Sequence, residues 1–230
     1  MLDKKLITLN SFKVMGYESD DIIPEGGLGA VSAHAGVGKT AFMVQLAINA
    51  MLRGKKVLHV SLHDPVNKVS LWYHELFSNI AGQAGKGNIN ETWEAILPNR
   101  FIMTFKVEGF NLPKLKERLT DLIVQNIFSP EVIIIDGIKF DELERDMIIS
   151  LKAMAHKHSQ RLWFTVHAHH REDSAAHEMP VALLPFADLF DVVFQLHPEG
   201  GEIYIKPLKG RISDSQRLFF DPATMLIKGN

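Results

Sequence analysis

The stretch LGAVSAHAGVGKT, residues 28–40, decides how the rest of the chain is read. Leu28 to Ala33 is a short apolar run of the kind that forms a buried strand. A glycine-containing loop follows, and Lys39 to Arg53 then has the mostly apolar composition of a buried helix that ends near Gly54. The stretch therefore predicts a strand, a tight loop and a helix in direct succession.

The loop itself, residues 33–40 (AHAGVGKT), fits the phosphate-loop pattern, with alanine at the usual first glycine. Small residues let consecutive backbone N–H groups curl around a β-phosphate, toward which the positive end of the following helix points. The residues expected to bind the nucleotide are Ala35, Gly36, Val37, Gly38, Lys39, Thr40 and Ala41. Lys39 can reach the β- and γ-phosphates, and the Thr40 hydroxyl can ligate Mg²⁺. The alternative is an incidental glycine turn that caps a core helix.

A carboxylate at the end of another buried strand completes this pattern. Val132 to Ile135 is a continuous apolar run that ends in Asp136. A carboxylate at the carboxyl end of a strand beside the loop can hold Mg²⁺, directly or through water. The two elements together predict binding of a nucleoside triphosphate, ATP, with Mg²⁺. In the alternative reading, Asp136 only caps the next turn or helix.

The remaining chain alternates strands with helices, which favours right-handed βαβ crossovers. Further strands are expected at 56–62, 100–105 and 162–167, helices at 66–80, 112–127 and 142–158, and short closing strands at 191–196, 202–206 and 217–220. This order predicts an α/β fold with a mainly parallel sheet and an antiparallel C-terminal extension. Only residues 81–90 resemble a linker, so residues 1–230 are expected to form one domain, with 1–22 as a lead-in.

The composition of the chain argues against several classes of function. The chain has 25 basic and 27 acidic residues, a net charge of −2, so nucleic-acid binding has no support in the total charge. Without cysteine there is no disulfide, thiolate metal site or cysteine nucleophile. The first residues, MLDKKLITLNSF, lack a signal-peptide core, and no apolar window is long enough to span a membrane. We therefore expect a cytoplasmic protein without membrane association.

At this point the residues resemble a known family, the RecA-type ATPase core, in its KaiC-like and DnaB-helicase-like branch. The segments that carry the resemblance are residues 23–33 leading into Gly38-Lys39-Thr40, VSLHDP at 60–65, ADLFDVVFQL at 187–196 and KPLKGR at 206–211. The resemblance covers roughly residues 10 to 228. It implies a RecA-like three-layer sandwich.

The resemblance also points to a catalytic position in which this chain departs from the family. After Ser-Leu the family usually has a glutamate that activates the attacking water, whereas this sequence has His63 followed by Asp64. A neutral His63 can accept a proton, since its unperturbed pKa lies near ~6.5. Asp64 can reach the water if the turn before Pro65 bends inward. If neither acts, hydrolysis is slow or absent.

Two further sets of residues follow from the resemblance. Lys209 and Arg211 correspond to basic residues that reach the γ-phosphate on the neighbouring subunit, which implies a homo-oligomeric ring or filament. The alternative is a solvated basic turn. His167 or His169 would serve as a sensor at a strand end, contacting the γ-phosphate or water. Their alternate spacing also suits a metal site, and a polar strand end facing solvent is the third possibility.

The function expected from these features is Mg²⁺-dependent ATP binding with slow hydrolysis, in a KaiC-like nucleotide-gated switch or assembly. One alternative is a DNA-directed motor of the helicase or recombination type, for which Arg171, in a polar segment, is the only candidate loop contact. Another is a non-hydrolysing nucleotide-binding scaffold, which His63 in place of glutamate favours. The sequence leaves ATP and GTP undistinguished.

Overall fold

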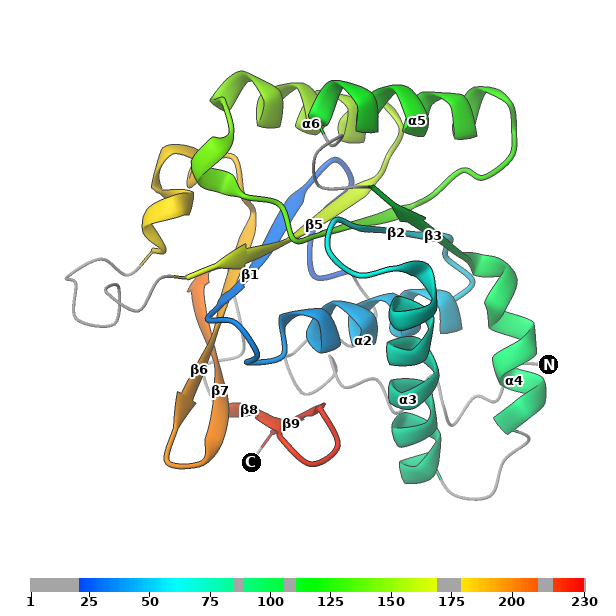
Figure 1. The fold of residues 1–230 in the computed structure, drawn as a ribbon, viewed down its shortest axis with the longest axis vertical. Helices are drawn as coiled ribbons and strands as arrows, with labels where there is room; N and C mark the ends of the chain where they lie inside the picture. The colour runs from blue at the N-terminus through cyan, green and yellow to red at the C-terminus, as the bar shows by residue number, and fades with distance from the viewer. Residues whose placement is uncertain (1–20, 85–88, 106–110, 169–178, 211–216, 230) are drawn as a thin grey trace.

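The computed structural model describes residues 21–84, 89–105, 111–168, 179–210 and 217–229. Within them one sheet runs through the whole structure (Figure 1). Its strands are β1 (Leu28–Ala33), β2 (Val57–Ser61), β3 (Arg100–Thr104), β4 (Val132–Asp136), β5 (Arg161–His167), β6 (Val192–Glu199), β7 (Glu202–Lys209), β8 (Leu218–Asp221) and β9 (Leu226–Gly229). Their order across the sheet is β3-β2-β4-β5-β1-β6-β7-β8-β9.

Helices cover both faces of the sheet (Figure 1). They are α2 (Lys39–Leu52), α3 (Val66–Ala84), α4 (Ile89–Ile96), α5 (Leu112–Val124) and α6 (Arg145–Lys157), joined by short 3₁₀ turns η2 (Leu97–Asn99), η4 (Phe140–Glu142) and η5 (Val181–Phe186). The apolar side chains of α2 and α3 form one core cluster with the sheet, and those of α5 and α6 form a second cluster on its other face.

The strands from β3 to β6 are parallel, and β7, β8 and β9 continue the sheet antiparallel. Crossover connections return the chain to the same end of the sheet before each new parallel strand, whereas short turns join β6 to β7 and β8 to β9. The coarse prediction of an α/β fold, with a mostly parallel sheet and an antiparallel C-terminal extension, is confirmed. Parallel pairing aligns Ala33 with His167 and Ser61 with Asp136 at the carboxyl ends.

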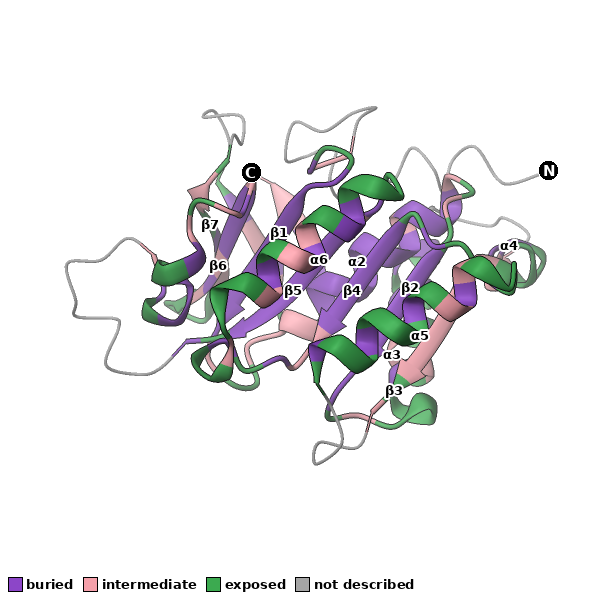
Figure 2. Cartoon of the chain, turned by 90° about the horizontal axis from the view of Figure 1, so that it is seen from above, coloured by how far each residue is buried: buried purple, intermediate pink, exposed green. Residues whose placement is uncertain are grey.

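The central strands are buried on both sides, as their unbroken apolar sequences require. Residues Val132–Ile135 have no more than 2% of their surface exposed. Figure 2 shows the same pattern across the sheet, with buried strands below helices whose outer faces are exposed. Helix α2 is buried on almost every side because the sheet, α3 and the C-terminal strands surround it. This burial explains why the sequence of α2 is almost entirely apolar.

A buried glutamine joins the C-terminal hairpin of β8 and β9 to α2. Gln45, 1% exposed, donates from Nε2 to the Met225 carbonyl at 2.7 Å and accepts at Oε1 from the Ile227 N–H at 3.0 Å. Side-chain atoms of Phe220 and Met225 lie 3.1 Å from where a Cβ on Gly38 would stand. The hairpin therefore supports the loop between β1 and α2 from behind.

Several boundaries differ from the sequence prediction. The stretch expected to be a linker is helical at both ends, because α3 continues to Ala84 and α4 begins at Ile89; the Phe77 and Trp93 rings pack 4.9 Å apart between these helices. Helix α5 ends at Val124 rather than at 127. Helix α6 begins at Arg145 rather than at 142, because Glu142 belongs to η4 and the two residues after it are extended. Neither α4 nor β9 was predicted, since each is short and its pattern depends on a distant partner.

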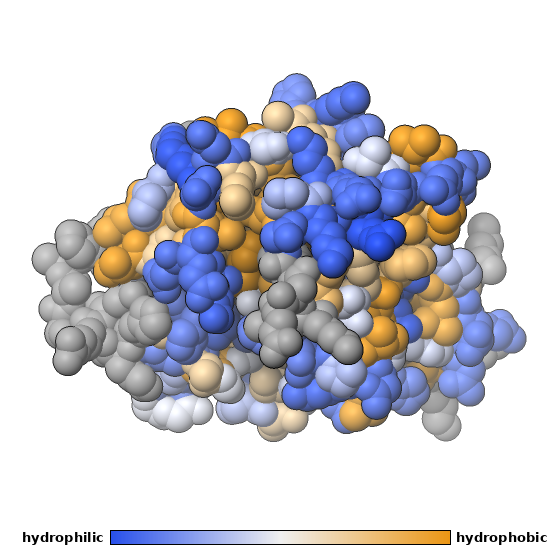
Figure 3. Space-filling view, turned by 45° about the horizontal axis from the view of Figure 1, so that its top comes forward, coloured by the Kyte–Doolittle hydropathy of each residue, from blue (hydrophilic) through white to orange (hydrophobic). Residues whose placement is uncertain are grey.

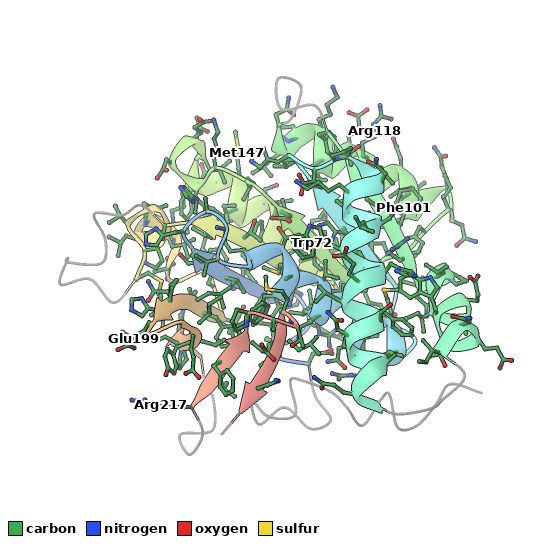
Figure 4. The ribbon with its side chains drawn as sticks, turned by 60° about the horizontal axis from the view of Figure 1, so that its bottom comes forward. Trp72, Phe101, Arg118, Met147, Glu199 and Arg217 are labelled. Atoms are coloured by element: carbon green, nitrogen blue, oxygen red, sulfur yellow. The ribbon has the colours of Figure 1, made fainter. Side chains whose placement is uncertain are left out.

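The surface is mixed in character. Figure 3 shows hydrophilic side chains over much of one face, with smaller apolar areas between them. The most exposed large apolar side chains include Leu71 on α3, Val124 at the end of α5 and Ile127 just after it. Trp72, labelled in Figure 4, instead packs from α3 against the core. None of the helices in the described residues has the length and apolarity needed to cross a membrane.

Candidate nucleotide site

The loop between β1 and α2 has a backbone shape that depends on its glycines. Gly36 has φ 79° and Gly38 has φ 109°, both in the left-handed region that glycine tolerates best. A Cβ on Gly36 would meet no atom within 4 Å, so conformation rather than lack of space favours glycine there. Helix α2 starts directly after Gly38, and the positive end of its dipole lies at the loop. An anion held by this loop would meet backbone N–H groups and that dipole together.

Lys39 folds back over the loop. Its Nζ atom donates to the carbonyls of Ala33 and His34, both at 2.8 Å. Burial lowers the pKa of the Lys39 amine below its ordinary value, although the nearby Asp136 carboxylate opposes that shift. The cation is thus kept at the loop by weak carbonyl ligands, which a phosphate oxygen would outcompete as a charged acceptor.

The carboxylate of Asp136 is held by hydroxyl groups from two elements. Thr40, in the first turn of α2, donates from Oγ1 to Oδ2 of Asp136 at 2.8 Å, and Thr165 on β5 donates to Oδ1 at 2.7 Å. Burial by itself raises the pKa of the Asp136 carboxyl, but His59 and the two hydroxyl donors outweigh burial and hold the pKa below its ordinary value. Asp136 is therefore a fixed, charged oxygen donor directly beside the loop.

A cavity of about 470 Å³ opens at this carboxyl edge of the sheet, lined by the loop and by the ends of β2, β4 and β5. The structure brings seven of the predicted residues to its wall: Ala35, Lys39, Thr40, His63, Asp64, Asp136 and His167. Gly36, Val37 and Gly38 belong to the adjoining loop, whereas Ala41 is 1% exposed and packs in the core. A cavity at the carboxyl ends of parallel strands is where α/β proteins bind their ligands.

His63 lies against the backbone that follows Asp136. A Cβ on Gly137, whose φ is 96°, would stand 2.4 Å from Cδ2 of His63. Only glycine leaves this position free, and the exposed imidazole occupies the vacant space at the cavity wall. The sequence prediction singled out His63 but not Gly137, because their proximity requires the pairing of β2 with β4.

Asp64 also reaches the cavity, yet its carboxylate is already paired. Its Oδ1 accepts at 2.8 Å from Nζ of Lys68, in the first turn of α3. Its backbone is fixed by Ser61, whose Oγ accepts from the Asp64 N–H at 3.0 Å and donates to the Asp64 carbonyl at 2.9 Å. The pair with Lys68 is largely exposed and weak, so Asp64 can be released from it at little energetic cost.

The remaining predicted residues are distributed elsewhere. His167 ends β5 at the cavity wall, whereas His169 and Arg171 lie outside the described residues. Lys209, at the end of β7, donates to the carbonyl of Ala187 at 2.8 Å and does not line the cavity of its own chain. Arg211 lies outside the described residues. Any role for Lys209 at a neighbouring subunit requires that it leave Ala187.

The sequence reading missed several residues of the site. Thr165 bonds Asp136 and also accepts from the Gly137 N–H at 2.8 Å, and Lys139 lines the cavity wall. His59 lies behind Asp136, with its Nε2 atom 3.8 Å from Oδ2. The sequence did contain a signal for two of them. Thr165 and His59 are polar residues inside otherwise apolar strands, where an unpaired polar group is costly, so each can be expected to have a polar partner.

A second cavity, of about 200 Å³, adjoins the first and shares the wall formed by His63, Gly137 and Lys139. The rest of its wall is mostly apolar and includes Leu112 at the start of α5. Met147, labelled in Figure 4, lines it from α6. The larger cavity alone contains the loop and the Asp136 carboxylate.

Comparison with known proteins assigns no family to this chain. A scan against protein-family models found no match, and a search of curated proteins also found none. The loop, the Asp136 carboxylate and the cavity between them are therefore the features that indicate a function.

Proposed function

We propose that this chain binds ATP with Mg²⁺ at the cavity beside the β1–α2 loop and acts as a KaiC-like protein of the RecA type. The observation that carries the proposal is the 2.8 Å hydrogen bond from Thr40 to Asp136, directly beside the loop carrying Lys39. The two residues are 96 positions apart in the sequence. Both are predicted Mg²⁺ ligands, Asp136 because its apolar strand occurs together with the loop that carries Thr40. Their contact is what a shared ion site requires.

The donor set suits Mg²⁺. Thr40 offers a hydroxyl oxygen and Asp136 a carboxylate oxygen, and Mg²⁺ prefers hard oxygen ligands, with water and substrate phosphates completing its shell. When bound, Mg²⁺ would neutralise charge on the β- and γ-phosphates. Lys39 would exchange its carbonyl partners for phosphate oxygens, and the backbone of Gly36 and Gly38 would hold the β-phosphate.

The residues near the reacting phosphate favour slow hydrolysis and a switch-like role. His63 follows β2 and lines the cavity, and it stands where the resembling family has glutamate. Asp64 is paired with Lys68 at 2.8 Å. A missing general base typically slows a reaction about 10²–10⁴-fold. The alternative function, a non-hydrolysing nucleotide-binding scaffold, is favoured by His63 in place of the glutamate.

Nucleotide binding is the first test. A fluorescent ATP analogue is titrated with Mg²⁺ against the full chain and against Lys39→Ala, with Lys157→Ala, at the exposed end of α6, as the matched control. We expect binding by the wild type and the control and a loss of at least about 10-fold for Lys39→Ala, because a charge-assisted contact to phosphate is removed. Equal affinity in all three proteins would refute the proposal.

Turnover then separates the modes of action. ATP hydrolysis is measured over a wide range of protein concentration, with and without single-stranded DNA. A specific rate that rises with concentration and falls in Lys209→Ala supports a ring or filament with a shared site. Binding without turnover supports the scaffold, and strong stimulation by DNA would indicate a motor instead.

A further inference from the structure

A buried polar connection runs from Asp136 into the core, away from the cavity. His59 on β2 and Tyr73 on α3 are both 0% exposed. The Nδ1 atom of His59 lies 3.1 Å from the hydroxyl of Tyr73, within hydrogen-bond distance. On the other side of the same ring, Nε2 is 3.8 Å from Oδ2 of Asp136 and has no hydrogen-bond partner among the described residues. The unpartnered nitrogen is therefore directed at the carboxylate.

Tyr73 and Asp136 together favour a proton on Nε2 of His59. Burial raises the pKa of the Tyr73 phenol, so the hydroxyl keeps its proton at neutral pH and can donate it to Nδ1. The proton of a neutral imidazole then resides on Nε2. The opposite tautomer would turn the Nε2 lone pair toward the Asp136 carboxylate, acceptor against acceptor, in a buried site where such a mismatch is costly.

The Tyr73 ring is itself fixed from the far side. The guanidinium of Arg100, on edge strand β3, lies 4.8 Å from the centre of the Tyr73 ring and 5.8 Å from that of Trp93 on α4. Such cation–π contacts hold the aromatic planes in place. Because His59 also packs edge-on against the Tyr73 ring, with centroids 5.7 Å apart, its own orientation is constrained.

We propose that His59 is a positioning residue for Asp136, its Nε2–H serving as the donor that orients Oδ2 toward the ion. The part concerning the ion rests on the proposed function. Thr40 also bonds Oδ2, but Thr40 is itself a proposed ligand, so its contact is not independent of the ion. His59 supplies a donor from within the core. At 3.8 Å the pair is an electrostatic contact, about 0.9 Å longer than a typical N–H···O hydrogen bond, and the proposal requires this separation to shorten.

Two substitutions separate a positioning role from mere packing. In His59→Asn the shorter amide occupies the place of Nδ1 and keeps the contact with Tyr73, while the donor toward Asp136 is lost. In His59→Gln the longer amide reaches the place of Nε2 and retains that donor. Partners that orient a metal ligand typically change metal affinity about 10–100-fold. We expect His59→Asn to weaken Mn²⁺ or Mg²⁺ binding by about 10-fold and His59→Gln by less than about 3-fold.

The readout is metal binding rather than turnover. Mn²⁺ binding to the ATP complex is followed by electron paramagnetic resonance, and affinity for the fluorescent nucleotide is measured without metal. We expect the metal-free affinity to stay unchanged in both variants, because Lys39 and the loop are intact. Equal losses of metal affinity in the two variants, or none in His59→Asn, would overturn the proposal.

A second measurement needs no nucleotide, and a substitution serves only to assign the signal. Two-bond ¹H–¹⁵N correlation spectra of the free wild-type protein report which ring nitrogen of each histidine is protonated. His59 is assigned by the signal absent from His59→Gln. A proton on Nε2 supports the proposal, and a signal with only Nδ1 protonated overturns it. If the wild type binds no nucleotide, the proposed function fails. The spectrum still shows whether His59 presents a protonated Nε2 to Asp136.

Discussion

The imidazole of His63 fills the space in which a side chain on Gly137 would lie. A side chain on Gly137 would begin 2.4 Å from Cδ2 of His63, so the imidazole lies where every other residue would place its Cβ. Because Gly137 directly follows Asp136, this contact ties the turn after β2 to the turn after β4. The position that carries glutamate in the resembling family is thus filled by a ring packed on the backbone beside the proposed ion ligand.

This packing gives a prediction for Gly137→Ala. Forcing a non-glycine residue into φ 96° costs roughly 1–2 kcal/mol, and the displaced His63 adds a steric part. We expect the free energy of unfolding, measured in urea, to fall by about 0.5–1 kcal/mol more when His63 is present than in a His63→Ala background. Gly200→Ala is the matched control, since Gly200 has φ 60° and open space around it, and its loss should be equal in both backgrounds. An equal loss for Gly137→Ala in both backgrounds would mean that the two residues do not compete.

Restoring the missing carboxylate is the second prediction. In His63→Glu a general base returns to the end of β2, and we expect the rate of ATP hydrolysis to rise by about 10²-fold or more if the wild type lacks an effective base. His63→Gln, of the same length but without a basic carboxylate, should show no increase. A fall in rate for both variants would instead identify His63 as the working base of the wild type.

The depressed pKa of Asp136 predicts how stability changes with acid. A carboxyl group whose pKa is lower in the folded than in the unfolded state stabilises the fold fully above its unfolded pKa, near ~3.9. That contribution is lost as the pH falls through the lower, folded value. We therefore expect the free energy of unfolding to decrease below about pH 4, and to do so less steeply in Thr165→Val, which removes one donor to the carboxylate. The slopes are compared by urea unfolding between pH 2.5 and 6; identical slopes would show that the Thr165 hydrogen bond does not set this pKa.

The fourth prediction concerns Gln45, which does not line the proposed nucleotide site. Gln45→Leu leaves the Met225 carbonyl and the Ile227 N–H unpaired in the core, and each such group costs about 1–3 kcal/mol. We expect the free energy of unfolding to fall by about 2–4 kcal/mol, with weaker nucleotide binding because the hairpin packs on Gly38. Asn49→Ala, one turn further along α2 and partly exposed, serves as the control and should change stability far less. Unaltered nucleotide affinity in folded Gln45→Leu would show that the hairpin does not shape the loop.

The local features of the fold were predictable from the sequence. The strand, loop and helix around Lys39 are adjacent in the chain, and the apolar run before Asp136 is a pattern that parallel sheets impose. The partners of Asp136 were not predictable, because Thr165 comes beside it only when β5 lies between β1 and β4. Likewise, the His63 contact depends on which strand pairs with β2. Spacing along the chain carries no information on strand order, and short elements such as α4 and β9 take their form from distant neighbours.

The hairpin behind the loop also has a consequence for biosynthesis. The hydrogen bonds of Gln45 to Met225 and Ile227 join residues 180 and 182 positions apart. These contacts cannot form before residues 225–227 have been synthesised, and closing so long a loop then has an entropic cost. A nascent chain on the ribosome carries the whole AHAGVGKT loop long before it has made the strands that support it. ATP should therefore be unable to stabilise partly synthesised chains, and binding competence should arise only when β9 has emerged.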